Sequence, residues 1–207
     1  MRLVPATLLA FTVLVTPFAA QERSAPKKPL TFAEAVEQAK KAIEAEKLGA
    51  AVTALQAAIR DVQKKQRTAI LACLPKPEGW TIQDNEVDEN ADALGATMVV
   101  MGLSLTRRYE NGDKSLAVEV TANSPMLQML TVVFSNPALI TADGGELVKY
   151  GPHKAILKKS GDNGQELQIL MHDTHLIKVD AQGLSADDLL KIFDQAFVDR
   201  LEKPLGK

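Results

Sequence analysis

Apolar residues recur at two different periods along this chain, and the change of period divides it into two parts. Between residues 31 and 74 they recur every three or four positions, the period of an amphipathic helix. After residue 75, short segments alternate every two residues, as half-buried strands do. We therefore predict a helical segment followed by an α+β domain over residues 75–207, with an antiparallel sheet of about five to seven strands packed with helices.

The helical segment carries two apolar series that are out of phase with each other. The first consists of Phe32, Val36, Ala39 and Ile43, and the second of Val52, Leu55, Ile59 and Val62. A capping box at Thr31 and Glu34 starts the first helix, and the phase breaks across residues 46–49. The pattern predicts a helical hairpin over residues 31–74, ended by Pro75 and packed on the following domain or on a second copy of itself.

The stretch from residue 115 to residue 139 is predicted to be central to the domain. Residues 115–121 alternate as a strand, and Asn111-Gly112 predicts a tight hairpin with a preceding strand over residues 96–109. Pro125 then begins an apolar run that we interpret as a helix. Since nearly all of its sides are apolar, we expect this helix to be buried against the sheet.

The remaining elements follow from turns and spacing. The acidic run of Asp84, Glu86, Asp88 and Glu89 predicts a solvated loop within residues 81–91. Four further strands are expected over residues 146–150, 153–159, 166–171 and 176–179. A last helix should start at Ser185 and end at Pro204. Its apolar stripe is Leu189, Phe193, Phe197 and Leu201.

The first twenty residues have the pattern of a targeting segment. Arg2 precedes an apolar run, and Pro17 lies just ahead of Ala19 and Ala20. This predicts a cleavable signal peptide over residues 1–20, a flexible leader over residues 21–30, and a periplasmic or secreted location. An uncleaved N-terminal membrane anchor is the alternative.

Composition argues against nucleic acid as a partner. The formal net charge is −2 and aromatic residues make up 4% of the chain, so neither a basic field nor a stacking platform is available. Cys73 is the only cysteine, so no intramolecular disulfide can form. We interpret it as a buried, inert thiol.

Two histidines lie close together in the sequence. If Asp173-Thr174 forms a two-residue turn, His172 and His175 flank it and Asp173 can add an oxygen ligand for a metal ion. A catalytic zinc site uses three protein ligands and a structural site uses four, so two histidines on an exposed turn fall short by themselves, and solvated turn residues are the alternative. None of the common sequence signatures of hydrolases or nucleotide-binding proteins is present, and no cofactor is predicted.

The methionines suggest an adaptable apolar surface. Met126, Met129 and Leu130 on the central helix, with Arg107, are the candidate ligand-binding residues, and core filling is the alternative role for the thioethers. Arg107 and Arg108 are neighbours in a strand and point to opposite faces, so only one of them can line a pocket. The alternative for Arg107 is surface pairing with Glu119 or Glu110.

Several short motifs occur in a recognisable order. They are the Leu74–Trp80 segment (LPKPEGW), Arg107–Tyr109 (RRY), Asn123–Gln128 (NSPMLQ), Ser135–Leu139 (SNPAL) and Gly144–Val148 (GGELV). In this order the chain resembles a family of uncharacterised exported bacterial proteins, and the resemblance brings no catalytic residues with it. The layout alone is similar to the PsbP-like α/β/α sandwich, which bears on fold and not on function.

The sequence therefore favours an exported, non-catalytic binding or interaction protein. Its partner would be an unknown protein or an apolar ligand, and the helical hairpin could mediate association of identical copies. A hydrolase or metal-dependent enzyme using His172, His175 and Asp173 is the competing hypothesis, and a structural envelope component is a third.

Overall fold

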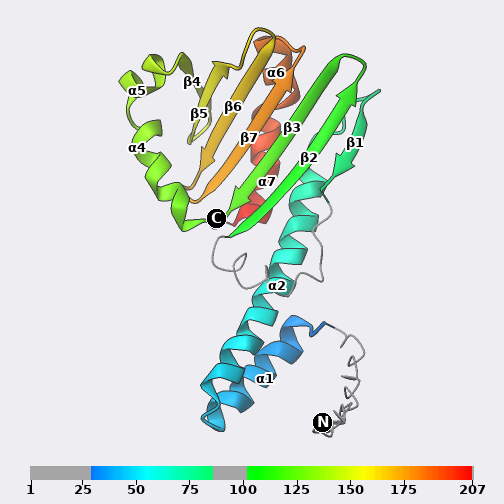
Figure 1. Cartoon of the computed structure of the whole chain (residues 1–207), viewed down its shortest axis with the longest axis vertical. Coiled ribbons are helices and arrows are strands. Elements are labelled where there is room, and N and C mark those ends of the chain that lie inside the picture. The colour runs from blue at the N-terminus through cyan, green and yellow to red at the C-terminus, as the bar shows by residue number, and fades with distance from the viewer. Residues whose placement is uncertain (1–28, 86–101, 207) are drawn as a thin grey trace, which may run out of the picture.

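The computed structural model describes residues 29–85 and 102–206. The predicted signal peptide, most of the predicted leader, and residues 96–101 of the first predicted strand lie outside these ranges. The described chain is α+β, with a helical hairpin followed by an antiparallel sheet and further helices, as the sequence predicts (Figure 1).

The helical hairpin consists of α1 (Phe32–Glu44) and α2 (Leu48–Cys73), and it extends away from one end of the sheet (Figure 1). The predicted capping box is present, because the Glu34 amide donates to the Thr31 hydroxyl and the Thr31 amide donates to the Glu34 carboxylate. The helices contact each other through small side chains, which allow close approach. The buried residues of this contact are Ala35, Ala39, Ala42, Ala51, Ala54 and Ala58.

The sheet has seven strands in the order β1-β2-β3-β7-β6-β5-β4, and each neighbouring pair is antiparallel. In chain order, the strands are β1 (Thr81–Asp84), β2 (Leu103–Asn111), β3 (Lys114–Ala122), β4 (Gly145–Tyr150), β5 (His153–Lys159), β6 (Gly164–Met171) and β7 (His175–Gln182). The hairpin predicted at Asn111-Gly112 joins β2 to β3, with Gly112 at φ 61°.

One face of the sheet carries the main core. It packs against α6 (Ala186–Ile192), α7 (Gln195–Leu205) and the last turns of α2, where Ile70 and Leu74 are buried. The stripe predicted for a single last helix is buried as expected, but the helix is divided. Asp194 accepts a hydrogen bond from the Phe197 amide and starts α7 as a new helix. Pro204 lies inside α7 rather than beyond it.

The prediction of a buried central helix is wrong. Residues 125–142 form three short helices, which are the 3-10 helix η1 (Pro125–Met129), α4 (Leu130–Phe134) and α5 (Pro137–Ala142). Met129 is 76% exposed and Val132 is 67% exposed. Leu130 and Phe134 join Ile156 and Leu170 in a small cluster at one corner of the second sheet face. Because the rest of that face is largely polar, it offers no apolar surface for a longer helix.

The loop predicted over residues 81–91 is partly a strand, since residues 81–84 form β1 and residues 86–91 lie outside the described ranges. Strand β1 pairs with β2, in a register that places Asp84 opposite Arg107. Of the helices within the described ranges, none is long and apolar enough to cross a bilayer.

Candidate functional site

All three histidines of the chain lie near the C-terminal half of α7. His153 is the first residue of β5, His172 lies in the turn between β6 and β7, and His175 is the first residue of β7. Glu202, on α7, reaches two of these rings. Sheet register brings the histidines together, since Met171 lies opposite His175 and β5 pairs with β6.

Each carboxylate oxygen of Glu202 is hydrogen-bonded to one imidazole ring. Its Oε1 lies 2.5 Å from Nε2 of His153, and its Oε2 lies 2.8 Å from Nε2 of His172. The two rings meet edge to face, with centroids 5.1 Å apart. Each of these three residues offers one atom that can bind a metal ion, and these three atoms lie within 4.8 Å of one another. This set is hereafter called the His–Glu cluster.

Burial and hydrogen bonding act in opposite directions on Glu202. Partial burial works to raise the pKa of its carboxyl group, but the hydrogen bonds from His172 and His153 outweigh this effect, and the pKa lies below its usual value. Glu202 is therefore ionised at neutral pH. Its side chain is 28% exposed, whereas that of His153 is 5% exposed.

The turn that carries His172 has an unusual backbone. His172 and Asp173 have φ values of 51° and 57°, and Thr174 N donates to the carbonyl oxygen of Met171. The turn thus includes His172, instead of being flanked by it as the sequence suggested. The left-handed conformation is costly for most residues with a side chain, although histidine and aspartate adopt it more often than others.

His175 belongs to a separate set of contacts. Its Nδ1 accepts a hydrogen bond from the Asn123 amide at 3.1 Å, and the ring also forms a backbone hydrogen bond with Leu205. Burial, followed by the nearby His172, lowers the pKa of His175. The neutral ring therefore links β7 to the start of the 123–142 segment and to the end of α7.

The structure changes the membership of the predicted metal site. Of the three proposed ligands, His172 belongs to the cluster, while His175 is held by backbone groups and Asp173 is exposed on the turn. His153 and Glu202 were missed, because they are 49 residues apart and only strand pairing and the packing of α7 bring them together. No spacing motif in the sequence indicates this pair.

Arg107 is a structural residue in this fold. It points to the core face and is 5% exposed, with Nε and Nη2 donating to Asp84 and Nη1 donating to the carbonyl oxygen of Leu71. Its partner is therefore Asp84, and this partly buried contact replaces the predicted surface pairing with Glu119 or Glu110.

The other predicted ligand-binding residues lie near a corner of the sheet. The Met129 side chain is exposed, and Leu130 packs on the small cluster of Phe134 and Ile156. The side chain of Met126 lies outside the described part of the structure.

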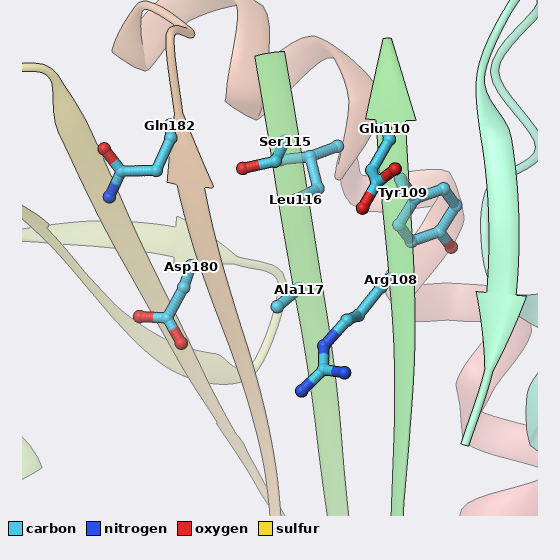
Figure 2. Close-up of a pocket in the computed structure, with 8 residues that line it drawn as sticks. All are labelled: Arg108, Tyr109, Glu110, Ser115, Leu116, Ala117, Asp180 and Gln182. Carbon is cyan, nitrogen blue, oxygen red and sulfur yellow. The ribbon is translucent and has the colours of Figure 1, made fainter. Parts of the chain in front are cut away.

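A shallow depression lies on the open face of β2, β3 and β7 (Figure 2). Its volume is about 280 Å³, and cross-strand pairs place Arg108 and Asp180 on either side of Ala117. Of the two neighbouring arginines, Arg108 is thus the one that lines a pocket. The depression is open and small and is bordered by charged side chains, so it does not match the predicted site for an apolar ligand.

A larger groove, of about 600 Å³, runs along the helical hairpin. Phe32 and Val36 of α1 line it together with Leu55, Ile59 and Val62 of α2, and Gly102 and Asn123 lie at one end. The hairpin thus presents an apolar surface beside its alanine contact.

Comparisons with protein-family models, with curated proteins and with solved structures found no match.

Proposed function

We propose that the protein is an exported, non-catalytic interaction protein that associates with a second copy of itself through the helical hairpin. Export is supported by the apolar run, Pro17 and Ala19-Ala20 near the N-terminus, and by the resemblance to exported bacterial proteins. The observation that carries the interaction is a set of large apolar side chains left exposed on α1 and α2. They are Phe32, Ile43, Leu48, Val52, Leu55, Ile59 and Val62, hereafter the hairpin face, and they are 43–66% exposed.

The spacing of the hairpin face is that of a helix-packing seam. Its five α2 residues, from Leu48 to Val62, are separated alternately by four and three positions, which is the heptad pattern of coiled coils. The alanines that join α1 to α2 occupy the adjoining side of each helix. In each hairpin, one side of each helix is therefore packed against the other helix and the adjoining apolar side is exposed, as expected for half of a four-helix bundle.

The residues that border this seam favour a second identical copy. On α2, the heptad position that follows Leu48, Leu55 and Val62 is occupied by Gly49, Gln56 and Gln63, so this one border of the α2 seam has no charge. Two copies can approach there without like-charge repulsion, and glutamine side chains can pair across the contact.

The apolar area is of the size that a stable dimer needs. Seven large side chains, each about half exposed, present on the order of 500 Å² of apolar surface. A standard interface buries about 800 Å² per partner, of which roughly 57% is apolar. The hairpin face supplies this apolar share.

Sedimentation velocity on protein purified from its export compartment tests the proposal, with Val52→Glu and Thr53→Glu as a matched pair. Thr53 is exposed and adjacent to Val52, but its heptad position lies outside the seam. We expect a concentration-dependent dimer for the wild type and for Thr53→Glu. Val52→Glu buries a charge in each copy and should weaken the dimer at least tenfold.

Three results would overturn self-association. They are a monomer at all concentrations, a dimer unaffected by Val52→Glu, and a monomer that retains an apolar molecule in native mass spectrometry. The last result would assign the groove to a ligand instead of to a second copy.

A further inference from the structure

The His–Glu cluster combines residues from three elements that are distant in sequence. His153 comes from β5, His172 from the β6–β7 turn and Glu202 from α7. A nitrogen of each imidazole and a carboxylate oxygen lie within 4.8 Å of one another. We propose that these three residues form a binding site for a divalent transition-metal ion, and that zinc is the ion that fits them best.

The donor atoms decide the class of ion. Zinc is bound by histidine nitrogen and by glutamate oxygen, and two histidines with one glutamate are a known ligand set of zinc sites that keep one position open. Calcium and magnesium take oxygen ligands, of which this cluster offers only those of Glu202. Nitrogen-rich sites of this kind also bind neighbouring transition metals, so affinity should follow the usual order for those ions.

The spacing of the ligand atoms is compatible with zinc after a small adjustment. At bond lengths of about 2.0–2.1 Å, tetrahedral ligand atoms lie about 3.3 Å apart. The two contacts run to different oxygens of Glu202, at 2.5 and 2.8 Å, and the three ligand atoms lie within 4.8 Å of one another, so each separation must change by no more than about 1.5 Å. Rotation of the Glu202 side chain can provide this shift, because that side chain is only partly buried.

The environment provides both rigidity and access. His153 is almost fully buried, and the His172 backbone is fixed in a turn that a hydrogen bond from Thr174 N to Met171 O closes. The side chains of His172 and Glu202 are 24% and 28% exposed, so an ion can enter from solvent. Three protein ligands leave a fourth position, which we assign to a water molecule.

Without a metal, the cluster is a carboxylate hydrogen-bonded to two imidazoles. These hydrogen bonds give all three side chains a partner even without an ion. The measurement must therefore distinguish a metal site from a hydrogen-bond network. Binding of zinc to metal-free full-length protein, followed by isothermal titration calorimetry, does so directly. We expect one zinc ion per chain for the wild type.

The variants are chosen to retain the local backbone and shape. Glu202→Gln keeps the side-chain volume and removes the charge, and His172→Asn removes the imidazole while placing asparagine, which tolerates positive φ, in the turn. Each should weaken zinc binding at least tenfold. Asp199→Asn removes an exposed carboxylate one turn earlier on α7 and should leave binding unchanged.

A second readout reports the ligand geometry and the state of the fold. Cobalt(II) should give the visible absorption of a four-coordinate nitrogen and oxygen site in the wild type and in Asp199→Asn, but not in Glu202→Gln. Zinc should raise the melting temperature of the wild type by several degrees and leave that of Glu202→Gln unchanged, because the ion binds only the folded ligand set.

Either of two results would overturn the proposal: no zinc binding to the wild type below about 100 µM, or binding of equal strength in Glu202→Gln and His172→Asn. Each variant must first show the wild-type circular dichroism spectrum without metal. Val52→Glu, on the hairpin, should bind zinc as the wild type does, so the metal site and self-association can fail independently.

Discussion

Arg107 and Asp84 form a bidentate ion pair between the adjacent strands β2 and β1. Nε of Arg107 lies 2.5 Å from Oδ1 of Asp84, and Nη2 lies 2.9 Å from Oδ2. The third contact, from Nη1 to the Leu71 carbonyl oxygen, joins the same side chain to α2. One residue thus connects β1, β2 and the helical hairpin, and the loss of Arg107 should loosen all three.

Replacing Arg107 should therefore cost more than replacing its neighbour. Arg107→Met removes three hydrogen bonds from a buried position, and we expect the free energy of unfolding to fall by about 2 kcal/mol. Arg108→Met changes an exposed residue on the opposite face and should stay within about 0.5 kcal/mol of the wild type. Urea denaturation of both variants measures the difference, and equal effects would contradict the structural role assigned to Arg107.

The same pair should make stability depend on pH in acid. The hydrogen bond from Arg107 lowers the pKa of Asp84, so the unfolded chain binds a proton more readily than the folded one. The stabilisation should be complete above about pH 4 and decrease as the pH falls through the folded pKa. In urea denaturation over this range, the stability difference between wild type and Asp84→Asn should shrink in acid. A constant difference would mean that the pair does not control this titration.

The fold could be predicted from the sequence wherever local pattern decides structure. The helical hairpin, the β2–β3 hairpin and the strands from β4 onward follow from apolar spacing and turn residues, which act over a few positions. The buried stripe of the last helices was also predictable. The division into two helices was not predictable. The apolar spacing of four continues from Phe193 to Phe197, and only the folded chain shows that Asp194, between them, caps a new helix.

The prediction of a buried central helix is wrong because an apolar segment is buried only where the fold offers an apolar surface to cover it. Most apolar strand residues lie on the face that α6 and α7 cover, so the segment from Pro125 to Phe134 has only a small apolar corner to contact. The hairpin shows the same effect, because alanines occupy the contact between the helices and the larger side chains of the hairpin face remain outside.

The His–Glu cluster shows what sequence cannot reveal. His172 could be chosen as a candidate from its nearness to His175, but its partners in space are His153 and Glu202. Their meeting depends on the register of three strands and on the position of one helix. These are long-range features that no local spacing encodes.

The two tyrosines should titrate together and unusually late. Burial is the main cause that raises the pKa of Tyr109 to about 12 and that of Tyr150 to about 12. Their hydroxyl groups donate to the carbonyl oxygens of Pro75 and Phe193. The chain has no other tyrosine, so ultraviolet absorbance should show almost no tyrosinate in the folded protein at about pH 10, where half would ionise in an unfolded chain.

Because these pKa values are raised on folding, the tyrosines stabilise the protein fully below about pH 10 and progressively less as the pH approaches 12. Tyr150→Phe should also lower the free energy of unfolding by about 1–2 kcal/mol at neutral pH, because it leaves the Phe193 carbonyl without this donor. Tyrosinate absorbance that rises near pH 10 without unfolding would contradict the burial of these residues.

Two glycines should respond in opposite directions to the same substitution. Gly102 has a φ of 87°, and a Cβ atom there would collide with the Ala122 carbonyl oxygen, whereas a Cβ atom at Gly49, in the first turn of α2, would meet nothing within 4 Å. We expect Gly102→Ala to lower the free energy of unfolding by at least about 2 kcal/mol. Gly49→Ala should raise it by about 0.5–1 kcal/mol, since alanine is the better helix former. Thermal and urea denaturation of both variants check this. A neutral Gly102→Ala would mean that the chain enters β2 by a different path and would remove Gly102 from the end of the hairpin groove.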